Sequence, residues 1–129
     1  MDASAIANFL LNRHRYPELA ALLDTEDTHV PEVCDLEVAS ALRTGLLQHE
    51  LTLNRAAEVL ADYFTLPLTR HRHRSLAPES LALWANFTIY DGSYVALAQR
   101  LGADFATHDK RLARAVRAHT SLRVLPMGR

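Results

Sequence analysis

Apolar residues recur along this chain with two spacings. Spacings of three and four residues predict helices, and short uninterrupted apolar runs between them predict strands. Helices are expected over Ala5–Asn12, Pro17–Asp24, Cys34–Gln48, Thr52–Phe64 with Thr52 as its N-cap, Pro78–Ala85, Thr88–Leu101 and Lys110–Ala118. Strands are expected over Thr28–Val30, Leu66–Thr69, Ala103–Thr107 and Leu122–Leu125. Helices that alternate with short apolar strands predict an α/β fold, with a parallel sheet covered by helices on both faces.

Length and composition narrow the class of protein. A chain of 129 residues fits one domain over residues 1–129, and 49% hydrophobic with 22% charged residues predicts a folded core. No apolar run reaches the roughly 18 residues of a membrane-spanning helix, and no secretory signal is visible at the start. Cys34 is the single cysteine, which excludes an internal disulfide and a thiolate metal site. We expect Cys34 to be buried and the protein to be cytoplasmic.

Charge is unevenly divided between the two halves of the chain. Residues 1–63 hold eleven Asp or Glu and four Arg, whereas residues 64–129 hold four acidic and ten basic residues. The net charge of −1 therefore does not describe a uniform polycation that coats nucleic acid. The division instead allows a basic surface beside an acidic pocket.

Four acidic residues stand out by their position. Asp2 precedes the first expected helix, and Asp109 follows the expected strand Ala103–Thr107, at the end of a strand where ligands of α/β sheets bind. Glu37 and Asp91 lie in expected helices, where their neighbours one turn away are mostly small or apolar. A lone carboxylate facing the packed side of a helix is costly, which favours a functional role for both.

Each acid also has a structural interpretation. Asp2 and Asp109 could be helix N-caps, and Thr88 with Asp91 has the spacing of a capping box. Glu37 could pair with an arginine or be half exposed. Capping does not explain an acid in the middle of a helix, so Glu37 is the hardest of the four to account for in this way.

Together the four acids indicate metal chemistry. Carboxylates without His or Cys partners suit hard cations such as Mg²⁺ or Mn²⁺, and a bound cation keeps converging carboxylates ionised. Such an ion can polarise a phosphate, activate a water molecule and stabilise a leaving oxygen, which hydrolyses phosphodiesters without a covalent intermediate.

Two adjoining segments resemble one family. Thr88-Ile-Tyr-Asp91-Gly-Ser-Tyr94-Val-Ala-Leu-Ala98 and then Leu101-Gly-Ala-Asp-Phe-Ala-Thr107-His-Asp109-Lys-Arg-Leu112 resemble the motifs of PIN-domain proteins of the VapC family. The start, Asp2-Ala-Ser4, and the segment from Pro31 through Glu37 are similar to two earlier motifs of the family. The likeness covers nearly the whole chain in the expected order.

The resemblance implies a fold and an activity. The fold would be a three-layer α/β/α sandwich, and the activity magnesium-dependent cleavage of RNA by the toxin of a type II toxin–antitoxin pair. It implies a homodimer and a VapB-type antitoxin as partners, with no membrane. By motif, the metal-binding catalytic acids would be Asp2, Glu37, Asp91 and Asp109, supported by the hydroxyl groups of Ser4 and Thr107. Gly92 replaces the alanine that is commoner in the family.

The start of the chain departs from the family pattern. Family members have a short apolar strand before the first aspartate, whereas only Met1 precedes Asp2 here. Either the sheet lacks its first strand or the true start lies upstream. A terminus that frays would hold Asp2 poorly.

Basic and aromatic residues have less specific patterns. The run Arg70-His-Arg72-His-Arg74 is expected in a loop, where Arg72 and Arg74 could contact RNA phosphates or simply be solvated. Lys110 and Arg111 directly follow Asp109 and are the other candidate RNA contacts. His108 is expected at the surface. Three aromatic residues are expected in the core: Trp84, Phe87 and Tyr90.

Three alternatives remain open from the sequence. A phosphoacceptor receiver domain also has an acidic magnesium pocket, but it needs an adjacent acidic pair and a late lysine, and Lys110 is the only lysine here. A non-catalytic PIN domain is the second alternative, and a PIN nuclease of RNA maturation is the third.

Overall fold

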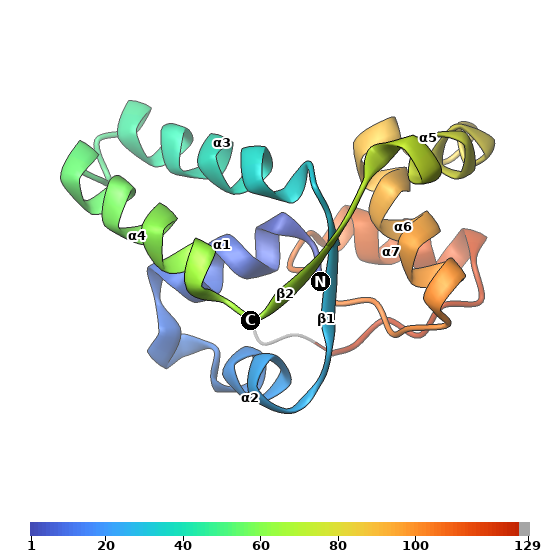
Figure 1. Ribbon diagram of the computed structural model, residues 1–129, viewed down its shortest axis with the longest axis horizontal. Coiled ribbons are helices and arrows are strands. Elements are labelled where there is room, and N and C mark those ends of the chain that lie inside the picture. The colour runs from blue at the N-terminus through green and yellow to red at the C-terminus, as the bar shows by residue number, and fades with distance from the viewer. Residues whose placement is uncertain (127–129) are drawn as a thin grey trace.

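The computed structural model describes residues 1–126 and is an α/β fold (Figure 1). Its helices are α1 (Ala3–Leu11), α2 (Pro17–Thr25), α3 (Cys34–Leu47), α4 (Leu53–Thr65), α5 (His73–Ala82), α6 (Ile89–Leu101) and α7 (Lys110–His119), with a 3₁₀ turn over Arg13–Arg15. Its strands are β1 (Thr28–Pro31) and β2 (Leu68–His71). No helix within residues 1–126 is long and apolar enough to cross a membrane.

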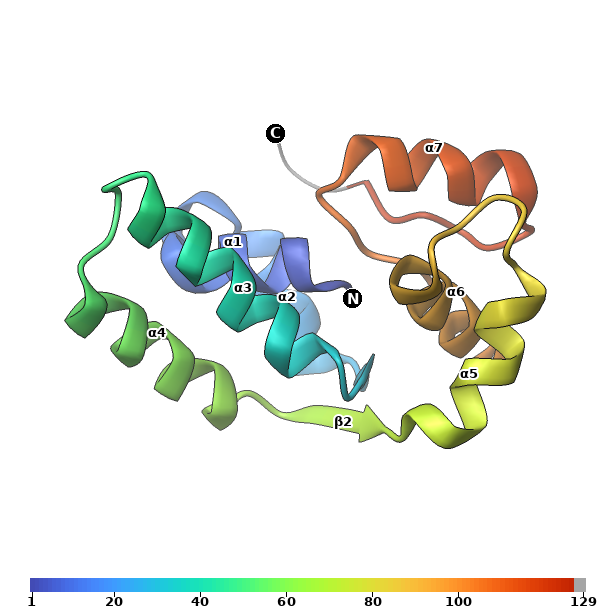
Figure 2. The same ribbon diagram turned by 90° about the horizontal axis from the view of Figure 1, so that it is seen from above.

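The strands pair in parallel and separate two layers of helices. Thr28 lies opposite Leu68, and Pro31 lies opposite His71. Helices α1, α3 and α4 lie on one side of the strands, and α5, α6 and α7 lie on the other (Figures 1 and 2). This arrangement confirms the predicted α/β fold with a parallel sheet and helices on both faces.

The last two expected strands are shorter than predicted. They meet at one parallel bridge between Phe105 and Val124, where the Phe105 amide donates to the Arg123 carbonyl (2.8 Å) and the Leu125 amide donates to the Phe105 carbonyl (2.8 Å). A cavity of about 560 Å³ lies where the two parts of the sheet face each other, with walls that include β1 residues and residues 103–106.

One contiguous core joins the layers. Fully buried side chains come from α1, α2, α3, α4 and α6, among them Ile6, Leu19, Val38, Tyr63 and Val95. Each large apolar side chain removed from water contributes about 1.5–3 kcal/mol. Cys34 belongs to this core and is buried, as predicted.

The segment after β2 differs from the prediction. The Arg70–Arg74 run is not a loop, because β2 extends to His71 and α5 begins at His73. The Val33 amide donates to Nε2 of His73 (2.8 Å), which holds the start of α5 against the start of α3. Pro78 therefore lies inside α5 rather than in its first turn, at the cost of one intrahelical hydrogen bond.

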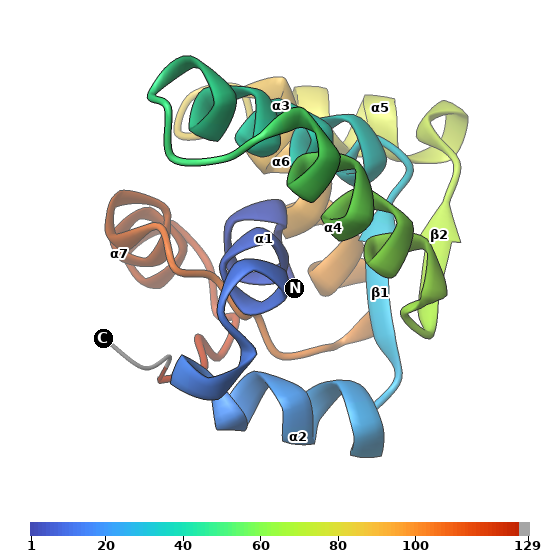
Figure 3. The same ribbon diagram turned by 90° about the vertical axis from the view of Figure 1, so that its left-hand side faces the viewer.

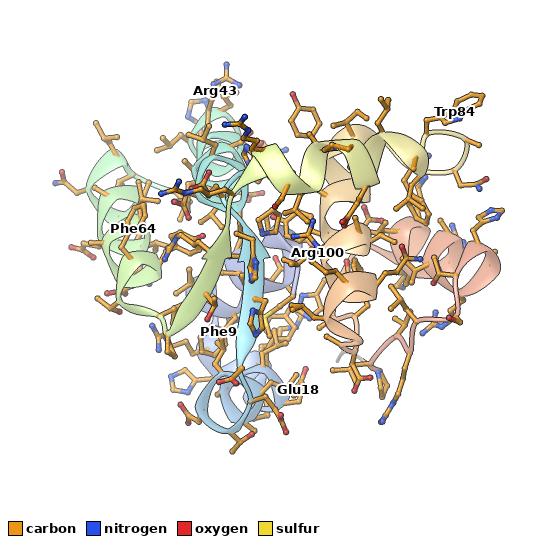
Figure 4. All side chains as sticks on the ribbon, turned by 45° about the vertical axis from the view of Figure 1, so that its right-hand side comes forward. Phe9, Glu18, Arg43, Phe64, Trp84 and Arg100 are labelled. Atoms are coloured by element: carbon orange, nitrogen blue, oxygen red, sulfur yellow. The ribbon has the colours of Figure 1, made fainter. Side chains whose placement is uncertain are left out.

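Two expected core residues lie in solvent, Trp84 in the turn between α5 and α6 and Tyr90 in the first turn of α6. Trp84 is 74% exposed and Tyr90 62% exposed, so the prediction was wrong for both, whereas Phe87 is buried as predicted. Trp84 projects from this end of the molecule in Figure 4. An apolar residue in a turn has no opposing layer to pack against, and sequence periodicity does not reveal where a layer ends.

Candidate active site

Asp2 is fixed by four groups that come from both ends of the chain. Its carboxylate caps α1, accepting from the Ala5 amide (3.2 Å) and the Ser4 hydroxyl (2.8 Å) through Oδ1. Oδ2 accepts from the Thr107 hydroxyl (2.6 Å), and the Asp2 amide donates to the Ala106 carbonyl (3.0 Å). Asp2 is only 6% exposed, so this residue is held in place rather than frayed.

Asp109 is joined to Asp2 through Thr107. The Asp109 amide donates to the Thr107 hydroxyl oxygen (3.0 Å), whose own proton goes to Asp2. Oδ1 of Asp109 caps α7, accepting from the Arg111 amide (3.0 Å) and the Leu112 amide (3.2 Å). Capping thus occupies one oxygen of this exposed carboxylate.

Glu37 lies in the first turn of α3, not in mid-helix as expected. An acid there is favoured by the helix dipole, so part of the argument from mid-helix position fails. Its Oε1 nevertheless faces the interior, where the buried Tyr94 hydroxyl donates to it (2.7 Å). Burial raises the pKa of Glu37, as does repulsion from Asp91 and Asp2, and the Tyr94 hydrogen bond opposes this rise.

Asp91 lies in the first turn of α6, behind the N-cap Thr88, whose hydroxyl accepts from the Asp91 amide (3.1 Å). The capping box is therefore present in part, with the Asp91 amide bonded to the Thr88 hydroxyl oxygen, and the Thr88 hydroxyl also hydrogen-bonds the Asp91 carboxyl group. Burial raises the pKa of the half-buried carboxyl group, and repulsion from Asp109 and Asp2 raises it further. Arg111 is among the groups that oppose this rise.

The four acids are connected by their mutual repulsion. Asp2 acts on Glu37 and Asp91, Asp91 acts on Glu37, and Asp109 acts on Asp91. They come from the starts of α1, α3, α6 and α7, and Figure 2 shows the N-terminal end of the chain between α3 and α6. Within residues 1–126, no three His, Cys, Asp or Glu side chains stand close enough together to share a metal ion as placed. The donor set itself is oxygen only, which fits a hard divalent cation.

Two neighbours of the acids were not identified as contributors from the sequence. Tyr94 orients Glu37, and its position one turn after Asp91 on the buried face of α6 was the available signal. His108 is not simply a surface residue: its ring packs on Tyr16 (centroids 4.6 Å apart), and Nδ1 lies 2.9 Å from the Asn8 amide nitrogen. Burial lowers the pKa of His108, and attraction to Asp2 and Glu18 opposes this fall.

The candidate RNA contacts occupy two places. Arg72 is the N-cap residue of α5, and Arg74 is the second residue of that helix. Lys110 and Arg111 are the first two residues of α7, directly after Asp109. All four side chains are exposed. The cavity of about 560 Å³ is lined by none of the four acids.

Comparison with known proteins gives the family. Residues 1–118 match the PIN domain. Ribonuclease VapC9 of Mycobacterium tuberculosis is 34% identical over 126 residues, which cover 98% of this chain and 97% of the relative. Ribonuclease VapC12 of the same species is 31% identical over 113 residues (88% of each chain), and Ribonuclease VapC3 of Pyrobaculum aerophilum is 30% identical over 118 residues (88% and 90%). The chain therefore belongs to the PIN-domain family and is a relative of the VapC proteins.

Proposed function

We propose that this protein is a magnesium-dependent endoribonuclease, the toxin of a type II toxin–antitoxin pair. One observation carries the proposal. Glu37 and Asp91 are half-buried and repel neighbouring acids, and burial raises the pKa of both carboxyl groups despite one hydroxyl hydrogen bond to each, from Tyr94 and Thr88. Such groups destabilise a fold, and a bound divalent cation is the usual compensation. Relatives that carry the name ribonuclease agree with this assignment.

Asp2, Glu37, Asp91 and Asp109 would hold the ion, Mg²⁺ or alternatively Mn²⁺. When bound, it would supply the polarised phosphate, the activated water and the stabilised leaving oxygen of phosphodiester hydrolysis. The other residues position these acids: Ser4 and Thr107 fix the orientation of Asp2, and Tyr94 fixes Glu37. Oε2 of Glu37 and Oδ2 of Asp109 take no part in the hydrogen bonds described above, so each carboxylate retains an oxygen that can bind.

Partners and location follow from the same assignment. The names of the VapC ribonuclease relatives support RNA as the substrate and a VapB-type antitoxin as the protein partner. A homodimer and a cytoplasmic location stay predictions from the family resemblance. The antitoxin is testable from the gene neighbourhood: a short adjacent reading frame that encodes a DNA-binding protein and neutralises the toxicity is expected. A neighbourhood of RNA-processing genes, with no toxicity on expression, would favour RNA maturation instead.

The substitution Asp91→Asn tests the catalytic assignment. Asn keeps the size of the side chain and removes the charge, so RNA cleavage is expected to fall by a factor on the order of 10²–10³ or more. The fold is expected to be as stable as the wild type or slightly more stable, because a repelling charge is lost. Asp104→Asn is the matched control, since Asp104 is an exposed acid that faces only Arg123 (3.8 Å).

The alternative of a purely structural Asp91 makes the opposite prediction. A cap residue matters to stability, by about 0.5–2 kcal/mol, and not to cleavage. Both variants should be measured for melting temperature and for cleavage of the same labelled RNA. An Asp91→Asn protein that melts early and cuts RNA as fast as the Asp104→Asn control would contradict the proposal.

A further inference from the structure

Helix α7 has an unusual distribution of charge. It holds Lys110, Arg111, Arg114 and Arg117 and no acidic residue. Its buried residues are Leu112 and Val116, which pack into the core. Because 3.6 residues complete a turn, the spacing of Lys110, Arg114 and Arg117 places these three cations in one line on the face opposite the buried one. All three are exposed.

This line of charge is not explained by the stability of the helix. Cations in a first turn oppose the helix dipole, and like charges four residues apart repel. Lys110 and Arg114 are in this position, since Lys110 begins α7. Among the residues that the structure describes, no ion pair is recorded for any of the three cations of the line. A surface that breaks local rules without a structural gain is a candidate binding surface.

The line begins at the acidic residues and leads away from them. Asp109 caps α7, so Lys110 directly adjoins the candidate active site. Seven residues of helix span about 10 Å from Lys110 to Arg117. Figures 2 and 3 show α7 along the outside of the molecule, on the far side from α4 and β2. An extended polyanion can therefore follow the helix and reach the acids with one end.

The second basic segment is less suited to this role. Arg70 forms an ion pair with Asp35 (2.8 Å), so one of its three arginines is already neutralised within the fold. Arg72 and Arg74 remain, at the start of α5.

We propose that Lys110, Arg114 and Arg117 on α7 form a track for the sugar–phosphate backbone of single-stranded RNA, next to the bond that is cut. The proposal deepens the proposed ribonuclease function and rests on it for the nature of the polyanion. Contacts of this kind give affinity without sequence preference. Sequence selection must then come from groups other than this track.

The test uses the full chain with Arg114→Gln and Arg117→Gln combined. Arg43→Gln with Arg55→Gln is the charge control, because both residues are exposed, carry the same total charge and lie on α3 and α4, with Arg55 in an exposed ion pair with Glu58 (3.4 Å). Arg43 is marked on the far side of the molecule from α7 in Figure 4. Binding of a labelled single-stranded RNA is measured in EDTA, which prevents cleavage, over a series of salt concentrations.

Loss of two phosphate contacts is expected to reduce the slope of log K against log salt by about 1.4, at about 0.7 per contact. The control is expected to keep the wild-type slope. With metal present, the KM for single-stranded RNA should rise for the α7 variant and stay at the wild-type value for the control. Melting temperatures of both double variants should match that of the wild type.

The outcomes separate the track from the ribonuclease function. Equal slopes for the α7 variant and the control would overturn the track. If that protein still cuts RNA, the ribonuclease function stands. Conversely, a reduced slope in a protein that never cuts RNA would support the track and reject the catalytic function. Polyglutamate that competes as well as RNA and loses binding equally in the α7 variant would indicate a docking face for an acidic protein instead.

Discussion

Replacing Gly92 with alanine tests how closely α5 and α6 pack beside the acids. Gly92 directly follows Asp91, and a Cβ atom there would lie 2.5 Å from Oγ of Ser80 and 3.3 Å from its carbonyl oxygen. Ser80 is fully buried, and its hydroxyl donates to the Ile89 carbonyl (2.6 Å). The added methyl group must therefore displace this hydroxyl or the backbone of α5.

The magnitude follows from three opposing effects. Overpacking of a filled site costs about 1–3 kcal/mol, and loss of the Ser80 hydrogen bond costs about 1 kcal/mol more if the hydroxyl turns away. Alanine is a better helix former than glycine, which offsets about 0.8–1.0 kcal/mol of this loss of stability. We therefore expect Gly92→Ala to destabilise the protein by about 1–2 kcal/mol, although alanine is the better helix former.

The assay is a double-mutant cycle measured by denaturant unfolding. Ser80→Ala alone should cost about 1 kcal/mol through the lost hydrogen bond. The double variant should be more stable than the sum of the two single effects predicts, by at least about 1 kcal/mol, because the atom that clashes is gone. A Gly92→Ala protein as stable as the wild type, or strict additivity in the cycle, would refute this reasoning about the α5–α6 contact.

Three further predictions concern the acids. Tyr94→Phe removes the donor to Glu37 and should destabilise the fold by about 1–3 kcal/mol. It should also diminish the rise in melting temperature that millimolar Mg²⁺ produces, and an undiminished rise would show that Tyr94 does not position the site. Thr107→Val removes the hydroxyl between Asp2 and the Asp109 amide, so stability should fall by about 1–3 kcal/mol. RNA cleavage should fall as well, which is measured by assaying the variant and the wild type in parallel on the same RNA. The third prediction concerns pH. Because the pKa of Asp91 is raised in the folded state, the unfolded chain ionises first, and the metal-free fold loses stability as pH rises from the unfolded-state pKa near 4 through the folded-state pKa. In EDTA, Asp91→Asn should therefore gain stability relative to the wild type across that pH range, and a difference that does not change with pH would contradict the raised pKa.

The sequence predicted the elements that periodicity and caps define. Thr52, Thr88 and Asp109 are the N-caps of α4, α6 and α7, and Gly102 ends α6 in the left-handed conformation. Each of these residues acts on groups within a few positions of itself, so local sequence is enough to assign it.

The errors arose where distant segments decide the outcome. Pro78 looked like a helix start, but α5 begins at His73 because β2 pairs with β1 as far as His71 and His73 meets Val33. Trp84 looked like core, but no layer covers the turn in which it lies. Contacts between segments 40 residues apart leave no local pattern to read.

In the candidate site too, local sequence revealed some residues and only the structure revealed others. The acids themselves are visible in the motifs, whereas the groups that hold them come from other parts of the chain. Thr107 bridges Asp2 and Asp109, and Tyr94 of α6 reaches Glu37 of α3. Ser4 was within reach of sequence analysis because it lies two residues from Asp2. Which oxygen of each acid stays available was visible only in the structure.

The most direct test of the central claim is the metal dependence of RNA cleavage by the purified protein. The chain, stripped of metal with EDTA and dialysed, is mixed with an end-labelled single-stranded RNA, and the products are followed as Mg²⁺ or Mn²⁺ is added back. The account predicts no cleavage without metal, cleavage at internal bonds that saturates with added metal, and cleavage by Asp91→Asn that stays lower by a factor on the order of 10²–10³ or more at every metal concentration. Cleavage that persists in EDTA, or that Asp91→Asn performs at the wild-type rate, would contradict it.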